Sequence, residues 1–121
     1  MSSPAPHVAI HRYRGHAEGA LFAEIRAQLQ PLLEKAPRIY IFAEFDPPEH
    51  FSYDTEFRNH WAEWFMQNRS RLIKVYMIQS SPLLKLAAMM VNLITGDIIT
   101  PVPDTAELER LKAQAVASNP S

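Results

Sequence analysis

The chain of 121 residues contains no cysteine, only three glycines and no excess of charge of either sign. The lack of cysteine excludes disulfides, thiolate metal ligands and cysteine nucleophiles. Gly15, Gly19 and Gly96 are too scattered to build a phosphate-binding loop or a dinucleotide fingerprint. Twelve basic residues against thirteen acidic ones, with no basic run, argue against nucleic acid as a partner.

Signals for secretion, membrane insertion and catalysis are also missing from the sequence. The segment MSSPAPHVAI has neither the basic nor the apolar region of a signal peptide, so we expect a cytoplasmic protein. No apolar run reaches the roughly 20 residues that a transmembrane helix needs. Ser80-Ser81 lacks the flanking glycines of a nucleophile elbow. We therefore expect a protein that is not an enzyme and binds no cofactor.

The composition is that of one globular domain. Apolar residues make up 47% of the chain and charged residues 21%, and a chain of this length can bury one hydrophobic core. Small and proline residues over 1–6 predict a flexible N-terminal arm, and we expect a flexible tail over 116–121. The folded domain is expected to span residues 7–115.

Hydrophobic periodicity predicts strands and helices in alternation along the chain. The expected strands are 7–15, 38–45, 72–79 and 97–102, and the expected helices are 17–35, 55–71, 82–95 and 104–115. The segment RIYIFAEF is apolar almost throughout, as in a strand buried on both faces. Such alternation favours an α/β domain whose parallel strands are covered by helices.

Several residues predict where the helices begin and end. Ser81 before Pro82 is typical of a helix start, and Gly96 can end the same helix in a left-handed conformation. Asp104 followed by Glu107 forms a capping box for the last helix. Pro31 is expected to kink the first helix, and Pro101 suits an edge strand.

The stretch EFDPPEHFSYDTEFRNHWAEWF, residues 44–65, concentrates carboxylates, histidines and aromatic residues. The simplest interpretation is a turn at Pro47-Pro48, a helix capped by Ser52 or Asp54 with Glu56 in its first turn, and a core-facing stripe that includes Trp61 and Trp64.

Three other roles for this stretch stay open. Ser52 or Thr55 could accept a phosphate at the start of the helix. His50 with Asp54, or Glu56 with His60, could contribute to a metal site, but a metal needs a third ligand that the sequence does not supply. We therefore expect no metal. Glu49 or Asp54 could act with His60 as a general acid-base pair. His7 and His11, on one face of a strand, are expected to face solvent.

The segment PLLKLAAMMVNLITG predicts a helix that is apolar around most of its circumference. Its large apolar residues include Leu83, Leu86, Met89, Met90 and Leu93. Such a helix has three possible roles: it is buried on both sides within the fold, it packs against a second copy of the chain, or it packs over a small apolar ligand. Each alternative stays open at this point.

Four segments resemble one family in their order and pattern: HVAIHRYRG, RIYIFAEFD with a following loop that ends FSYDT, LIKVYMIQSSP, and LLKLAAMMVNLITGDII. Over residues 7–115 they resemble STAS domains, the SpoIIAA-like group of anti-sigma factor antagonists. The resemblance implies a mixed four- to five-stranded sheet flanked by about four helices.

In that family, the loop after the second of these strands carries a serine that a partner kinase phosphorylates. Asp54 and Thr55 match the first two positions of the family's motif, but Glu56 and Phe57 replace the serine and the glycine. The resemblance thus implies a non-enzymatic regulatory module that binds protein partners, with Ser52, Asp54, Thr55 and Glu56 as candidate contact residues.

The leading hypothesis from the sequence is such a module, dimeric through the apolar helix 82–94. The alternative is a domain that binds a small apolar ligand or lipid, similar to SEC14-like domains, which resemble the same topology. The same five apolar residues would line either the dimer interface or the ligand site.

Overall fold

The structure is a computed structural model that describes residues 2–45, 51–78 and 81–118. The strands are β1 (Ser2–Ala5), β2 (Val8–Tyr13), β3 (His16–Ala17), β4 (Ile39–Phe45), β5 (Ser52–Tyr53), β6 (Leu72–Ile78) and β7 (Ile99–Val102). The helices are α1 (Leu21–Lys35), α2 (Thr55–Gln67), the short 3-10 helix η2 (Arg69–Arg71), α3 (Pro82–Thr95) and α4 (Thr105–Ala117).

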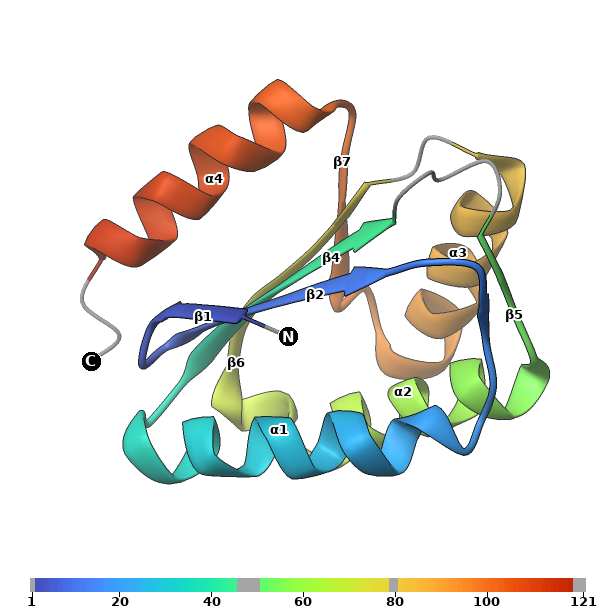
Figure 1. Ribbon diagram of the computed structural model, residues 1–121, viewed down its shortest axis with the longest axis horizontal. Coiled ribbons are helices and arrows are strands. Elements are labelled where there is room, and N and C mark those ends of the chain that lie inside the picture. The colour runs from blue at the N-terminus through green and yellow to red at the C-terminus, as the bar shows by residue number, and fades with distance from the viewer. Residues whose placement is uncertain (1, 46–50, 79–80, 119–121) are drawn as a thin grey trace.

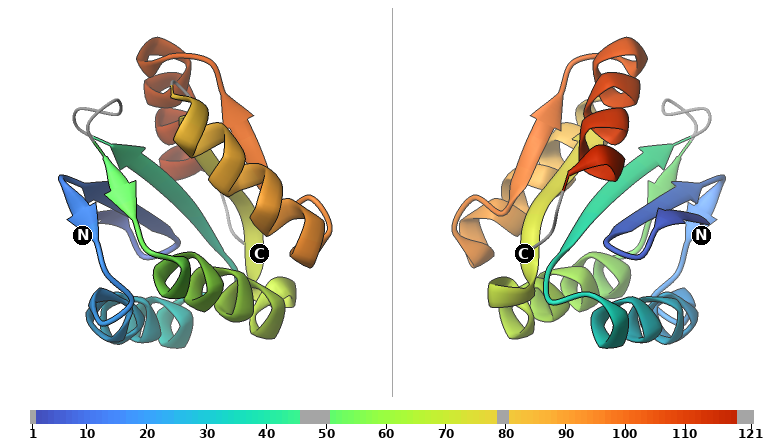
Figure 2. Two further views of the ribbon diagram at one scale, coloured as in Figure 1. Left: turned by 90° about the vertical axis from the view of Figure 1, so that its right-hand side faces the viewer. Right: turned by 90° about the vertical axis from the view of Figure 1, so that its left-hand side faces the viewer.

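Five of the strands form one mixed sheet in the order β1-β2-β4-β6-β7 (Figure 1). β1 runs antiparallel to β2, and the other neighbouring pairs are parallel. Helices α1, α2 and α3 cover one face of the sheet, and α4 covers the other (Figure 2). The predicted α/β class, with its mixed four- to five-stranded sheet and about four helices, is confirmed.

β4 lies at the centre of this sheet, between β2 and β6. Successive side chains of a strand point to opposite faces, so Ile41 packs under the three helices and Phe42 packs under α4. Both side chains are fully buried. This position explains why RIYIFAEF is apolar almost throughout, as the sequence predicted.

The larger core lies between the sheet and α1, α2 and α3. α1 contributes one buried stripe, made by Phe22, Ile25, Leu29, Leu32 and Leu33, and the helix continues through Pro31 to Lys35. The smaller core, under α4, is centred on Phe42 and Leu108.

Two arginines of η2 hold the ends of other helices. Arg69 Nη1 donates to the carbonyl of Thr95 at 2.6 Å, at the end of α3. Arg71 Nη2 donates to the carbonyls of Leu33 and Ala36, at the end of α1. The helix predicted over 55–71 ends at Gln67. The two arginines therefore lie beyond it, and their long side chains reach the carbonyl groups at the ends of α1 and α3.

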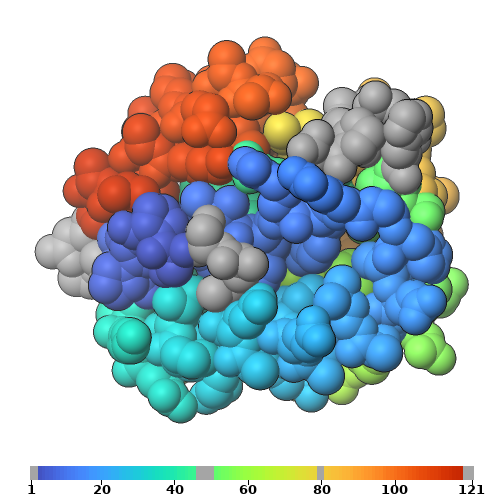
Figure 3. Space-filling view, viewed as in Figure 1, coloured from blue at the N-terminus to red at the C-terminus, as the bar shows by residue number. Residues whose placement is uncertain are grey.

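The N-terminal segment differs from the flexible arm expected over residues 1–6. Ser2–Ala5 forms β1, which pairs with β2 through Ser2 and Ile10 and through Ala5 and Val8. The pairing satisfies backbone hydrogen-bonding groups on the edge of β2. Composition alone does not show that β2 has an edge open to another strand. Figure 3 shows this segment beside α4 on one face of the molecule.

Two short strands were not expected from the sequence. β3 and β5 pair in parallel as a separate two-stranded sheet, so α1 begins at Leu21 and not near Ala17. At the other end, α4 extends through Val116 to Ala117, into the expected tail. The last three residues of that tail lie outside the described residues.

Candidate functional site

The apolar helix of the sequence is α3, and its ends are formed as predicted. The Ser81 hydroxyl accepts a hydrogen bond from the Leu84 N–H at 3.2 Å, and Pro82 takes the first helical position. Gly96 ends the helix with a φ of 78°, a left-handed conformation that glycine adopts without a steric penalty. A Cβ at this position would also lie only 3.1 Å from Arg69 Nη1.

One face of α3 packs against the sheet and α2. Its buried residues are Leu84, Ala87, Ala88, Val91 and Thr95. α3 is therefore a half-buried helix and not a helix enclosed within the fold, which was one of the three alternatives from the sequence.

The opposite face of α3 is apolar and exposed. We call it the α3 outer face, and it consists of Leu83, Leu86, Met89, Met90, Leu93 and Ile94. Leu86 is 46% exposed, Met89 55% and Leu93 77%, while Met90 is half-buried. The view from this side shows α3 in the foreground with no other element over it (Figure 2, left). Apolar side chains grouped in this way mark interaction sites on soluble proteins.

One edge of the α3 outer face is polar. Lys85, Asn92 and Asp97 line a shallow depression there together with Met89, Leu93 and Pro101. The Asn92 side chain is used within the fold, because its amide donates to the Ile99 carbonyl and accepts from the Ile99 N–H. Lys85 and Asp97, both exposed, therefore place opposite charges toward the two ends of this edge.

The start of α2 brings together the predicted regulatory residues. Asp54 caps the helix, since one carboxylate oxygen accepts from the Phe57 N–H at 2.7 Å and the other from the Gly19 N–H at 3.0 Å. These two hydrogen bonds hold the pKa of Asp54 below its ordinary value. Gly19 must be glycine here, because a Cβ would lie 2.6 Å from the Cβ of Glu56.

The neighbours of Asp54 are placed differently. Ser52 is half-buried as a residue, and its hydroxyl shares an exposed hydrogen bond of 2.7 Å with His16 Nδ1. Thr55 and Glu56 are exposed in the first turn of α2. The capping interpretation thus accounts for Asp54, and Thr55 and Glu56 are the candidates of this group that are open to a partner.

The metal interpretation finds no assembled site. Within residues 2–45, 51–78 and 81–118, no three histidine, aspartate or glutamate side chains are grouped to hold an ion. His60 stacks on Phe22, with 5.5 Å between ring centroids. The suggested pair of His50 and Asp54 lies in part outside the described residues, as does that of Glu49 and His60.

His7 and His11 are buried, so the expectation that they face solvent was wrong. They also lie on opposite sides of the sheet. His7 precedes β2, which begins at Val8, so it does not follow the alternation of side chains along that strand, whereas His11 lies within it. His7 Nε2 donates to the Ala115 carbonyl of α4 at 2.6 Å. His11 packs edge-on against Trp61 of α2 and stacks on Tyr13.

His11 should make the protein sensitive to acid. Burial lowers the pKa of His11 to about 4 from 6.5, so between these values the unfolded chain binds more protons than the folded one. Stability from this group is complete above pH 6.5 and is lost toward pH 4. We expect His11→Phe to remove the effect. As the pH falls from 6.5 to 4, the free energy of unfolding of this variant should therefore rise relative to that of the wild type by up to about 3 kcal/mol. Chemical denaturation at several pH values measures this, and a constant difference between the two proteins would contradict it.

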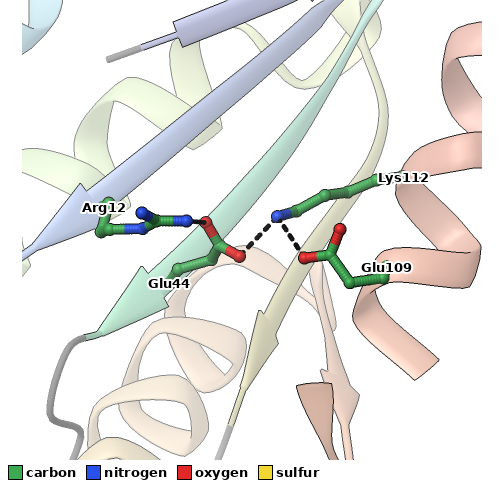
Figure 4. Close-up of polar contacts among 4 residues, drawn as sticks. All are labelled: Arg12, Glu44, Glu109 and Lys112. Atoms are coloured by element: carbon green, nitrogen blue, oxygen red, sulfur yellow. Dashed lines mark hydrogen bonds and ion pairs between the residues drawn. The ribbon is translucent and has the colours of Figure 1, made fainter. Parts of the chain in front are cut away.

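A charged cluster lies under α4, on the other face of the sheet (Figure 4). The Glu44 carboxylate is buried in β4 and receives Lys112 Nζ of α4 at 2.5 Å and Arg12 Nη2 of β2 at 3.3 Å. Lys112 also pairs with the exposed Glu109 at 2.9 Å. The sequence pattern predicts that the strand containing Glu44 is apolar almost throughout. A carboxylate inside a central strand was the signal that a buried cation must face it.

Comparisons with known proteins do not assign the chain to a family. No family model matches it, and neither a curated protein nor a solved structure gives a match. Among the described helices, none has the length and apolar character to cross a membrane.

Proposed function

We propose that this chain is a protein-interaction module of the STAS type that self-associates through the α3 outer face. The observation that carries the proposal is the exposed row of large apolar side chains on α3. An ordinary surface helix places charged and polar residues on its solvent side. On α3 the solvent side carries Lys85 as its exposed charge, and burial of the row would remove several leucine and methionine side chains from water.

A second copy of the chain fits the charges at the edge of this face. Most soluble homo-oligomers are two-fold dimers, in which the same patch meets itself. When two α3 helices pair antiparallel about a two-fold axis, residues on the same edge at opposite ends of the helix become neighbours. Lys85 of one copy then lies beside Asp97 of the other, and the pair occurs twice. Met89 and Leu93 are paired across the same axis.

A charge-swap experiment tests this arrangement. We expect Lys85→Glu to weaken the dimer roughly tenfold, because two attractive pairs at the rim become repulsive. Adding Asp97→Lys should restore most of the affinity, although either change alone weakens the dimer. The dissociation constant from sedimentation equilibrium at low salt gives the readout, since salt screens exposed charges.

The double variant separates pairing from a general effect of charge. If Lys85→Glu and Asp97→Lys act additively, the two residues do not face each other and the antiparallel arrangement is wrong. Asp97 has a φ of 60°, which favours aspartate and asparagine over lysine. Thermal melts of the Asp97→Lys protein alone therefore serve as the control for its folding.

A further inference from the structure

The oxidisable sulfur of this chain is confined to methionine, because the sequence contains five methionines and no cysteine. Oxidation to the sulfoxide converts a flexible apolar side chain into a polar one and disrupts interfaces that contain methionine. Met77 is buried in the larger core, and Met90 is half-buried. Met66 and Met89 are exposed to nearly the same extent, at 56% and 55%. Among the described methionines, these two are the most accessible to an oxidant in solution.

Met89 lies in the middle of the α3 outer face. Lys85 precedes it by four residues and Leu93 follows it by four, and side chains four residues apart on a helix are neighbours. All three line the same shallow depression. In the antiparallel dimer proposed above, Met89 packs on Leu93 of the second copy, and the two-fold axis makes this contact twice. Met89 is thus open to solvent in the monomer and covered in the dimer.

We propose that Met89 is an oxidation site at which hydrogen peroxide controls self-association. The inference rests on the proposed dimer and adds the regulation of its interface. The thioether sulfur of Met89 attacks one oxygen of the peroxide, so that an S–O bond forms and the O–O bond breaks. Sulfur loses two electrons to the peroxide, and the departing hydroxide takes the proton of the transferred oxygen and leaves as water. The reaction takes place on the monomer, in which Met89 is accessible.

The sulfoxide opposes dimer formation for two reasons. Its oxygen needs a hydrogen-bond donor, and the apolar contact with Leu93 of the second copy offers none. Lys85, four residues away, can donate to this oxygen, but a lysine that turns toward the sulfoxide leaves Asp97 of the second copy unpaired. Because the two-fold axis applies the loss twice, we expect oxidation of Met89 to raise the dissociation constant about a hundredfold.

Met66 on α2 provides a matched internal control. It is as exposed as Met89, but it is not part of the α3 outer face. At protein concentrations below the dissociation constant, the two side chains should react with hydrogen peroxide at similar rates. At about a hundredfold above that constant, only the small monomer fraction exposes Met89, so its oxidation should slow roughly tenfold while that of Met66 stays the same. Peptide mapping by mass spectrometry measures both rates in one sample.

Methionine-to-leucine variants identify the methionine responsible. Leucine keeps the volume and the apolar character of methionine but cannot be oxidised, so Met89→Leu should dimerise as the wild type does, before and after peroxide treatment. Met66→Leu and Met90→Leu should lose the dimer on treatment, as the wild type does. Sedimentation velocity measures the dimer, and circular dichroism establishes that each oxidised protein is folded. Methionine sulfoxide reductases should restore the dimer, because they return the sulfoxide to the thioether.

Three results would overturn the role of Met89 and leave self-association standing. The first is a wild-type dimer whose dissociation constant is unchanged after Met89 is fully converted to the sulfoxide. The second is a Met89→Leu protein that loses its dimer on peroxide treatment, and the third is a dimerising wild type in which the rate of Met89 oxidation does not depend on protein concentration. A wild-type protein that is monomeric at every concentration before oxidation would instead overturn the proposed dimer, and this inference with it.

Discussion

Replacing Leu93 by aspartate is expected to raise the dissociation constant of the proposed dimer about a thousandfold. Leu93 is the most exposed apolar side chain of α3, at 77%, so the change should leave the folded monomer intact. In the dimer each substitution removes one buried leucine, worth about 2 kcal/mol. The two-fold axis applies the loss twice, which gives about 4 kcal/mol, or about three factors of ten.

Val116 provides the matched control for this prediction. It is an exposed apolar residue, 39% accessible, on α4 at the other face of the sheet. Val116→Asp makes the same chemical change far from α3 and should leave the dissociation constant unchanged. Sedimentation equilibrium on both variants gives the comparison. If Leu93→Asp dimerises as tightly as Val116→Asp does, α3 is not the interface.

Replacing Lys112 by methionine is expected to destabilise the fold by about 4 kcal/mol. Methionine is nearly as long as lysine, but among the described residues it leaves the buried Glu44 carboxylate with the exposed Arg12 as its one cationic partner. Removal of one member of a buried ion pair typically costs about 3 to 5 kcal/mol, because the other charge stays desolvated. Urea denaturation measures the change in the free energy of unfolding.

Two further variants show whether burial is the cause. Glu109 pairs with the same lysine but is 59% exposed, so Glu109→Ala should change stability by less than about 1 kcal/mol. Glu44→Gln combined with Lys112→Met removes both charges and should recover much of the stability. A double variant as unstable as Lys112→Met alone would show that packing of the lysine stem, and not the unpaired carboxylate, sets the cost.

The sequence predicts much of this fold because local signals and the global architecture agree. Asp54, Ser81 and Asp104 each cap a helix through the backbone N–H three residues later, as their residue types predict. Pro101 lies in the edge strand β7. The hydrophobic pattern also placed the large residues of α3 correctly as an unusual apolar set, while leaving open which side would be covered.

The remaining features depend on contacts between distant parts of the chain. Arg69 and Arg71 cap helices that end 26 or more positions away in the sequence, and no local pattern records such a partner. His11 is buried because Trp61 packs over it. An apolar cavity of about 70 Å³ beneath α3 has walls from Phe45, Phe57 and Leu84, which belong to three separate elements, so the sequence lists its residues but does not bring them together.

The most direct test of self-association is the mass of the wild-type protein in solution across a range of concentrations. Sedimentation velocity should show a concentration-dependent shift from a monomer of 13.8 kDa to a species of twice that mass, with no larger closed assembly. A single species with the mass of the monomer at every concentration, up to the highest that stays soluble, would contradict the proposal that the α3 outer face joins two copies of the chain.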